Sequence, residues 1–460
     1  MENATRESRG PGGAGNLDQE MARIAVRRLS LTDFRSYPFV RLETDSRPVV
    51  LTGPNGAGKT NLLEALSYLV PGRGLRRAPL SEVGRVDAKG ANDGGGPRAW
   101  AVAARIERGG TEMDVGTGYL QNGAENERAR RVIKLDGAPA KNQAELGRQI
   151  SAQWLTPQMD RLFLEGPSAR RRFIDRLILG FDPDHAGPLN AYEQSLRNRN
   201  RLLRDGASDQ DWFNSVEDSL ASHGVAVAVR RRDAIARLGP LAARGLGPFP
   251  GAIISLGGAL EDWLAAGPAL AAEDQMRQAL SVSRQKDAAA NGTSIGPHRS
   301  DVLVSHSDAG LEAARCSTGE QKALLVSIVF AAAQLQAEDR GHSPLLLLDE
   351  VAAHLDDTRR DALFELVGET TKHPLVRQAV SLVTDSAFAP NAINHVRRHA
   401  TRFIVKTRTQ YTAALRQNMS ALIEGVIAPR AFVKEFFQLA EAGNLRHDIR
   451  RKLVLSLLVS

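Results

Sequence analysis

A glycine-rich loop between an apolar stretch and a helical stretch limits the possible folds of this chain more than any other feature. The loop reads Gly-Pro-Asn-Gly-Ala-Gly-Lys-Thr over residues 53–60, after the apolar residues 49–52 and before the helical stretch 61–66. Strand, glycine turn and helix form the context that the pattern G-x-x-x-x-G-K-[ST] requires. We therefore predict an α/β fold in which the start of that helix faces a phosphate group. A glycine-rich turn that binds nothing is the alternative.

Each residue type in this loop has a physical reason to be there. The glycines allow the backbone to curl, so that successive N–H groups and the positive helix end face a phosphate. Lys59 reaches the β- and γ-phosphates and is a candidate catalytic residue, while the Thr60 hydroxyl ligates magnesium. The predicted nucleotide-binding residues here are Gly53, Pro54, Asn55, Gly56, Ala57, Gly58, Lys59, Thr60 and Asn61. The predicted cofactors are ATP and Mg2+.

A pair of carboxylates follows an apolar run near the other end of the chain. Four leucines occupy residues 345–348, which suits a strand that is buried on both faces of a parallel sheet. Asp349 and Glu350 then lie at the carboxyl end of that strand, where ligands of open α/β sheets bind. Asp349 would hold magnesium through water, and Glu350 would orient or deprotonate an attacking water as a catalytic residue. Alternatively, the two acids merely end a core strand.

A second glycine turn opens a helix shortly before that strand. It reads Ser-Thr-Gly-Glu-Gln-Lys over residues 317–322, ahead of the apolar run 323–333. If two copies of the chain pack head to tail, this turn in one copy covers the phosphate loop of the other, and ATP joins the interface. The residues predicted to bind nucleotide in this way are Ser317, Gly319, Glu320 and Gln321. The alternative is an ordinary helix that Ser317 caps, with Glu320 at its third position.

The residues around these motifs resemble the RecF family of DNA-repair ATPases, which are relatives of SMC-type heads. The resemblance begins at 29–37, continues through 53–76, and includes Thr-Pro-Gln-Met-Asp-Arg-Leu-Phe at 156–163 and Gly-Pro-His-Arg-Ser-Asp at 296–301. It covers the chain from about Arg23 to about Asp385. It implies an α/β ABC-type ATPase head, made of a mixed sheet with an antiparallel subsheet and flanking helices, with an inserted compact helical lobe.

Composition and the order of the motifs divide the chain into five parts. The middle of the chain is rich in Ala, Leu and Arg, with one proline-glycine break at 239–254 and without the long heptad repeats of coiled-coil arms. The expected parts are a disordered extension at 1–20, the N-terminal part of the head at 21–145, the helical lobe at 146–288, the C-terminal part of the head at 289–390, and a basic, partly helical tail at 391–460. Met21 is a second candidate for the translation start.

Five positions are judged from the family pattern alone. Glu320 stands where the family usually has Gln, a change that ABC signatures often carry. The resemblance adds Asp356 and Thr384 to the nucleotide-binding candidates. It leaves open whether Thr384 or Asp385 senses the γ-phosphate. Gln158 is either a magnesium ligand or a solvated loop amide.

Charge is concentrated at the end of the chain. The tail 391–460 has 12 Lys and Arg against 4 Asp and Glu, and it accounts for the overall net charge of +7. Such a tail attracts phosphate backbones without reading sequence, although two amphipathic helices packed on the body explain it equally well. No stretch approaches the roughly 18 to 20 apolar residues of a membrane span. We expect a cytoplasmic, nucleoid-associated protein without a membrane partner.

The family resemblance implies a specific function. ATP would close a head-to-tail homodimer on double-stranded DNA near single-strand gaps, with a RecR-type partner, and would promote recombinase loading. A weak DNA-dependent hydrolysis of ATP to ADP and phosphate would release the dimer. One alternative is the nucleotide-binding subunit of an ABC transporter, which would need a complete Leu-Ser-Gly-Gly-Gln signature and a switch histidine. Another is a DNA-binding scaffold that does not hydrolyse ATP.

Overall fold

The computed structural model describes residues 24–85, 99–120, 130–207, 209–368, 379–382 and 401–404 of the 460-residue chain. The expected extension 1–20, Met21, Thr384 and Asp385 lie outside these residues, as does most of the expected tail. Within the described ranges, no helix combines the length and the apolar character that a membrane crossing requires.

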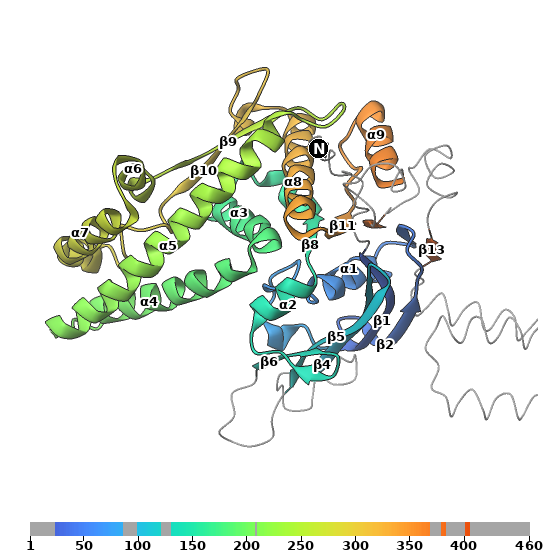
Figure 1. Cartoon of the computed structure of the whole chain (residues 1–460), viewed down its shortest axis with the longest axis horizontal. Helices are drawn as coiled ribbons and strands as arrows, with labels where there is room; N and C mark the ends of the chain where they lie inside the picture. Colours follow the sequence, from blue (N-terminus) through green and yellow to red (C-terminus); the bar gives the residue numbers. More distant parts are fainter. Residues whose placement is uncertain are drawn as a thin grey trace, which may run out of the picture.

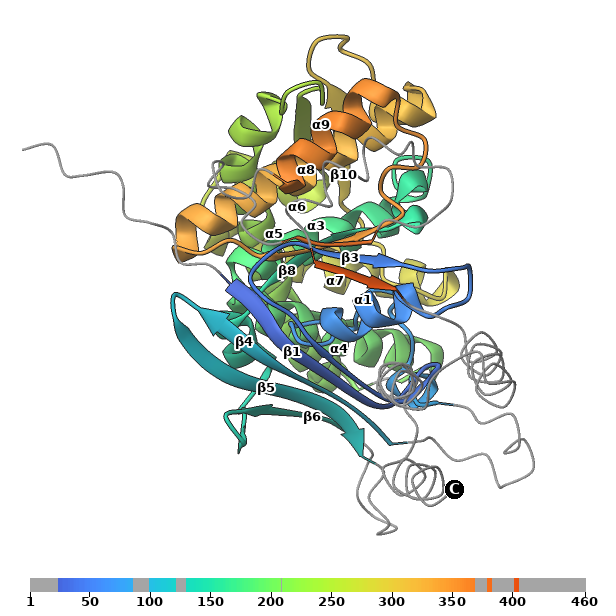
Figure 2. The same cartoon turned by 90° about the vertical axis from the view of Figure 1, so that its right-hand side faces the viewer.

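Five parallel strands from distant parts of the chain form the central sheet (Figures 1 and 2). They are β3 (Val49–Thr52), β8 (Ala152–Leu155), β11 (Leu345–Asp349), β12 (Ala379–Leu382) and β13 (Thr401–Ile404). Their order is β13-β3-β12-β11-β8, and every neighbouring pair is parallel. The expected end of the head at residue 390 leaves out β13, because this strand pairs with the free edge of β3.

The antiparallel strands form a sheet of their own. It has the order β2-β1-β4-β5-β6-β7, with β1 at Ile24–Phe34, β2 at Tyr37–Glu43, β4 at Trp100–Arg108, β5 at Thr111–Leu120, β6 at Arg130–Leu135 and β7 at Ala138–Pro139. Helix α1 (Lys59–Ser67) shares one hydrophobic core with this sheet and with one face of the parallel sheet. Figure 2 shows α1 between the two sheets.

The four leucines of β11 are buried on both faces, as predicted. Leu345 and Leu347 belong to the core around α1. Leu346 and Leu348 belong to a second core that contains the apolar residues of α8 (Thr318–Arg340). The alternation of strand side chains therefore places one row of leucines in each core. Helix α9 (Asp357–Gly368) follows β11, and the 3-10 turn Ala313–Arg315 precedes α8.

The middle of the chain is helical, but its first part belongs to the head. The main helices are α3 (Pro167–Phe181), α4 (Ala186–Arg204), α5 (Gln210–Ala243), α6 (Ala259–Ala266) and α7 (Ala269–Ala289). A separate core joins α4, the first half of α5, α6 and α7, and these helices project to one side in Figure 1. The expected lobe 146–288 starts too early, because β8 within it pairs with β11 in the central sheet.

Shorter elements connect the lobe to the head. Strands β9 (Ala252–Gly257) and β10 (Asp301–His306) form an antiparallel pair that packs in the core of α8. Helix α2 (Gln143–Gln149) precedes β8. Three 3-10 turns lie at Leu80–Glu82, Pro157–Arg161 and Pro183–His185.

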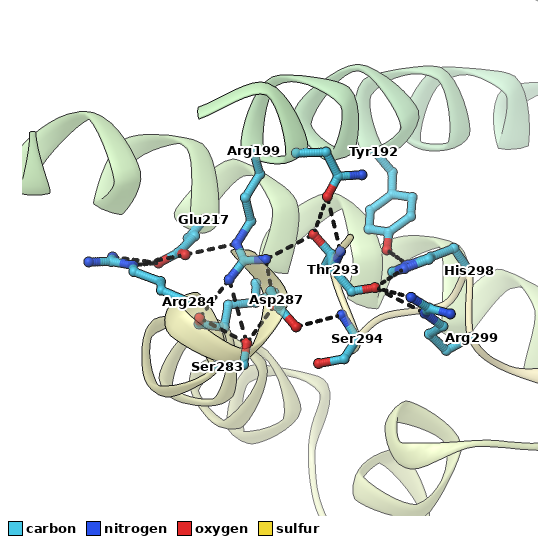
Figure 3. A network of polar contacts seen from close by, with 12 residues as sticks. Tyr192, Arg199, Glu217, Ser283, Arg284, Asp287, Thr293, Ser294, His298 and Arg299 are labelled. Atoms are coloured by element: carbon cyan, nitrogen blue, oxygen red, sulfur yellow. Dashed lines mark hydrogen bonds and ion pairs between the residues drawn. The ribbon is translucent and has the colours of Figure 1, made fainter. Parts of the chain in front are cut away.

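A buried polar network fixes the lobe helices to the turn that precedes β10 (Figure 3). Arg199 of α4 is fully buried, and its guanidinium donates to Glu217 at 2.8 Å, to Asp287 at 2.7 Å and to the Thr293 hydroxyl at 2.8 Å. The Thr293 carbonyl in turn accepts from His298 Nε2 at 2.9 Å. Because every nitrogen of this guanidinium has an acceptor, the network orders the lobe instead of providing a reactive group.

Candidate nucleotide site

The phosphate loop has the closed shape that its glycines allow. Gly56 and Gly58 have φ angles of 77° and 98°, in the left-handed region. A Cβ atom on Gly58 would lie 2.6 Å from the Tyr37 hydroxyl oxygen, so only glycine fits there. The Ala57 N–H closes the turn by donating to the Pro54 carbonyl at 3.1 Å. Helix α1 begins directly after this turn, with its first N–H groups next to the loop.

Lys59 is held against the loop that it follows. Its ammonium donates to the carbonyls of Gly53 at 2.7 Å and Pro54 at 3.0 Å, and the residue is 6% exposed. The fixed position places a full positive charge beside the glycine turn. A loop of N–H groups with such a charge suits a polyphosphate.

One hydrogen bond joins the two distant motifs. The Thr60 hydroxyl donates to Asp349 Oδ1 at 3.3 Å, across 289 residues of sequence. Burial raises the pKa of the Asp349 carboxyl, and the Glu350 charge raises it further, whereas Thr60, Arg76 and Lys59 act in the opposite direction. A cation bound beside Asp349 would therefore stabilise the ionised form of this desolvated carboxylate.

The donor set fits Mg2+ when a nucleotide supplies further ligands. Among the described residues, no three His, Cys, Asp or Glu side chains gather as a metal cluster. Thr60 and Asp349 offer hard oxygen donors, and Mg2+ is commonly held by one or two such groups together with phosphates and water. These two residues would hold the ion.

Glu350 lies at the turn that ends β11. It is exposed and has a φ of 48°, a conformation that turns the chain sharply after the buried strand. Its carbonyl accepts from Ala353 N–H at 3.1 Å and from the Lys322 ammonium at 3.5 Å. Within the described part of the chain, no hydrogen bond or ion pair engages its carboxylate. The backbone is fixed while the side chain stays available to a water molecule.

Lys322 and Asp160 form an ion pair that the sequence did not reveal. The Lys322 ammonium donates to Asp160 Oδ2 at 3.1 Å, and the lysine is 3% exposed. Burial raises the pKa of Asp160, and the Lys322 charge opposes this shift. Lys322 closes the motif at 317–322, but a spacing of 162 residues to Asp160 gives no sequence signal. The pair ties the start of α8 to the 3-10 turn Pro157–Arg161, and the same ammonium also contacts the Glu350 carbonyl.

The glycine turn before α8 forms the capped helix that was the alternative interpretation. The Ser317 hydroxyl accepts from the Glu320 N–H at 3.4 Å, and the Glu320 carboxylate accepts from the Ser317 N–H at 2.9 Å. Gln321 is buried and its amide donates to the Cys316 carbonyl at 2.9 Å. Ser317 remains exposed, and Gly319 is half-buried. A Cβ atom on Gly319 would lie 3.4 Å from the His354 carbonyl oxygen. A contact with a partner copy is thus compatible with the cap.

Two other predicted residues have local roles in the structure. Asp356 Oδ1 accepts from the Arg359 N–H at 2.8 Å and so caps the start of α9. Gln158 is exposed in the 3-10 turn after β8 and lines a cavity bordered by α3 and α4. No described contact joins Gln158 to Thr60 or Asp349. For Asp356, capping of α9 explains the residue without the predicted contact to nucleotide.

A second unpredicted cluster supports α1 from the side. Glu64 is fully buried and pairs with Arg35 at 2.6 Å and Arg76 at 2.7 Å. Arg76 also donates to the Asn61 side chain at 2.7 Å, and Asn61 donates to the Ser36 hydroxyl at 2.9 Å. Asn61 and Glu64 lie one helical turn apart, so one face of α1 carries both. Their i, i+3 spacing is the one feature of the sequence that could have predicted this shared face.

Comparisons with known proteins agree with this arrangement. The family model described as RecF/RecN/SMC N terminal domain matches residues 25–384. The "DNA replication and repair protein RecF" of Rhizobium rhizogenes is 46% identical over 347 residues, covering 75% of this chain and 89% of that protein. The protein with the same description from Agrobacterium fabrum is 45% identical over 367 residues, covering 79% of this chain and 93% of its own length.

A solved structure has the same fold. It is described as the recombination mediator protein RecF-ATPrS in the RecFOR pathway. It superimposes with a TM-score of 0.67 at 22% sequence identity and covers 79% of this chain and 93% of its own. A second, described as RecF-ATP in the same pathway, gives a TM-score of 0.65 at 22% identity and covers 80% and 96%.

Proposed function

The chain belongs to the RecF family of DNA replication and repair proteins, and on that premise we propose that it is an ATP-dependent DNA-binding protein. ATP closes two copies head to tail on double-stranded DNA near single-strand gaps, where the dimer promotes recombinase loading. The observation that supports this most directly is the contact between Thr60 and Asp349, because it unites the phosphate loop and the acidic strand end in one site.

The site's own residues account for a slow hydrolysis. Lys59 neutralises charge on the β- and γ-phosphates, and the N–H groups of the glycine turn hold the phosphate chain. Glu350 accepts a proton from a water whose oxygen attacks the γ-phosphorus, and the proton then passes to the released phosphate or to solvent. The new P–O bond forms as the bond to the bridging oxygen of ADP breaks, which yields ADP and phosphate. Magnesium, when held by Thr60 and Asp349, neutralises the phosphate charge.

The head-to-tail arrangement completes the site with a second copy. Ser317 is exposed at the start of α8, and no described contact joins it to the phosphate loop of its own chain. The N-terminus of a long helix attracts an anion, so the same turn in a partner copy suits the γ-phosphate. Hydrolysis removes that phosphate and weakens the interface. Turnover is therefore a release switch, and a weak DNA-dependent rate is sufficient for it.

The partners follow from the family. Relatives carry the description DNA replication and repair protein RecF, and a structural neighbour is described as a recombination mediator of the RecFOR pathway. We extend this to gapped DNA, single-stranded DNA at the junction, a RecR-type partner and a role in the SOS response to DNA damage. The protein would act in the cytoplasm, on the nucleoid.

The test is the rate of ATP hydrolysis per monomer as a function of protein concentration, with and without gapped duplex DNA. We expect the rate to rise with concentration, to increase with DNA and to vanish in Lys59→Arg. Glu350→Gln should bind ATP normally and accumulate as a dimer in analytical ultracentrifugation. A rate that is independent of concentration and DNA would contradict the proposal and favour a transporter-type subunit. If the wild-type protein bound DNA but hydrolysed no ATP, the result would favour the DNA-binding scaffold.

A further inference from the structure

A cavity outside the nucleotide site lies where the head meets the helical lobe. Its volume is about 410 Å3, which lies within the range of about 300 to 1,000 Å3 typical of small-molecule sites. It is bordered by the loop that follows α1, by β8 with its 3-10 turn, and by α3 and α4, which meet near the centre of Figure 1. The lining of this cavity does not include Lys59, Thr60 or Asp349, nor the residues to which they are hydrogen-bonded.

Four arginines line this cavity without a carboxylate partner. They are Arg73 and Arg77 from the loop after α1, and Arg172 and Arg176 from α3. In the described part of the chain, none of the four forms an ion pair, although Arg172 donates to the Ser168 hydroxyl. Partial desolvation of its guanidinium lowers the pKa of Arg77, although the side chain is partly open to solvent; the charges of Arg172 and Arg73 lower the pKa as well, whereas those of Glu193 and Asp175 oppose the shift. These guanidiniums repel one another across the space.

Arg176 provides a donor that the protein leaves unused. Its guanidinium stacks on Trp154 at 4.5 Å and Phe173 at 5.3 Å from the ring centres. One nitrogen donates to the Trp154 carbonyl at 3.1 Å, but Nη2 is buried and has no acceptor among the described residues. Burial and the Arg77 charge lower the pKa of Arg176 to about 9. A buried cationic donor without an acceptor is costly, and a ligand would supply the acceptor.

The acidic residues around the cavity offset the charge of these arginines only in part. Asp175 is engaged by Arg231 at 2.8 Å and by His185 at 3.0 Å. Glu193 pairs along α4 with Arg197 at 3.7 Å. Glu165 is the remaining acidic residue of the lining, and no ion pair within the described residues involves it. The cavity therefore keeps a positive charge.

We propose that the cavity lined by Arg73, Arg77, Arg172 and Arg176 binds a phosphate group at a site separate from the ATP site. Arginine matches phosphate because its planar fork donates two parallel hydrogen bonds. Apolar side chains of Leu75, Leu162 and Leu189 also line the cavity, which suits the sugar or base of a phosphate ester. The phosphate belongs either to a free small molecule or to the end of a DNA strand.

The test uses the full chain with its ATP site saturated by Mg2+ and a non-hydrolysable ATP analogue. Inorganic pyrophosphate is titrated calorimetrically into wild type, into Arg77→Gln/Arg172→Gln and into Arg204→Gln. Arg77 and Arg172 are exposed, so the double variant should fold, and unchanged thermal unfolding checks this. Arg204 is an exposed arginine of α4 outside the cavity and controls for net charge.

We expect saturable binding that weakens at least about tenfold in the double variant, because the variant removes two guanidiniums that would form charge-assisted hydrogen bonds with the phosphate. It should persist in Arg204→Gln. Absent binding, or equal binding in the double variant, would overturn the proposal. A parallel titration compares one oligonucleotide with a 5′-phosphate or a 5′-hydroxyl. A phosphate-dependent gain that the double variant loses identifies a DNA end as the source, and pyrophosphate binding without that gain identifies a free small molecule.

Discussion

At the residue scale, the buried cation of Lys322 contacts the turn that carries Glu350, the residue proposed to act on water. Its ammonium contacts Asp160 and the Glu350 carbonyl. Lys322→Gln should leave the partly buried Asp160 carboxylate without its partner and cost about 3 kcal/mol of folding stability. It should also lower the ATPase kcat at least about tenfold with little change in ATP affinity, because Lys59 and the loop stay intact. Denaturant unfolding and steady-state kinetics measure the two effects.

Two variants control this experiment. Lys134→Gln removes the same charge from an exposed position of β6, and it should change neither quantity. Lys322→Gln/Asp160→Asn removes both charges and should recover part of the stability, because no unpaired carboxylate remains buried. If kcat fell equally in Lys134→Gln, the geometric role of Lys322 would be refuted.

His298 makes stability depend on pH. Burial, together with the charges of Arg299 and Arg171, lowers the pKa of His298 to about 4, although its bond to the Thr293 carbonyl and the Asp287 charge oppose the shift. Between the unfolded pKa of about 6.5 and the folded value, the unfolded chain takes up a proton that the folded chain does not. Stability from this residue is therefore complete at neutral pH and falls as the pH drops towards 4.

The measurement is the free energy of unfolding at pH 7 and pH 4.5, for wild type and for His298→Gln. Wild type should lose about 2 kcal/mol more than the variant over this interval. Other titrating groups, including His342, whose pKa burial also lowers to about 4, remain in both proteins and cancel. Equal losses in the two proteins would contradict the assignment to His298.

At the scale of elements, the Gly-Pro-His-Arg turn is where the lobe is joined to β10. Gly296 has a φ of 135°, and a Cβ there would lie 2.3 Å from the Tyr192 hydroxyl oxygen. Gly296→Ala should cost roughly 2–4 kcal/mol through backbone strain and this clash. Thermal unfolding measures the loss. Gly292→Ala is the matched control, since its Cβ would meet the Arg299 side chain only at 3.9 Å.

A double variant separates the two causes. Gly296→Ala/Tyr192→Phe removes the clashing oxygen and should recover part of the loss, while the strained φ keeps the rest. Recovery to wild-type stability would show that the backbone conformation costs nothing.

Local patterns predicted the elements that carry the chemistry. The strand before the phosphate loop and the strand of four leucines are both confirmed, and so is the family. These signals depend on neighbouring residues. The helix break expected at 239–254 starts too early, because α5 continues through Pro240 to Ala243. Leu238 and Ala242 are buried in the core of α8, so tertiary packing maintains this last turn.

Ion pairs between distant residues could not be predicted in the same way. Arg199 meets Asp287 across 88 residues, and Lys322 meets Asp160 across 162. In the sequence, a charged residue that becomes buried and paired cannot be distinguished from a solvated charge on a helix surface, because its partner lies far away along the chain. The sequence therefore predicted candidate nucleotide-binding residues but not the ion pairs around them.

At the scale of the whole molecule, the lobe and the head have separate hydrophobic cores, while α5 contributes residues to both. Arg199→Leu should leave Asp287 of α7 buried without its cation and cost about 3–5 kcal/mol. Hydrogen exchange followed by mass spectrometry should show faster exchange in α7, with β11 and α8 unchanged. Arg197→Leu, an exposed substitution on the same helix, should have no such effect. Faster exchange throughout the chain would show instead that the two cores unfold together.

The strand order of the central sheet also has a consequence for protein synthesis. The apolar strand β3 is flanked by β12 and β13, which come more than 300 residues later in the chain. At about 5 to 20 residues per second, the ribosome completes these partners roughly 15 to 70 s after β3. Val49, Val50 and Leu51 therefore lack their neighbours during most of translation. Ribosomes that stall before β12 would release a chain with an uncovered apolar edge, a species that cells must bind with chaperones or degrade.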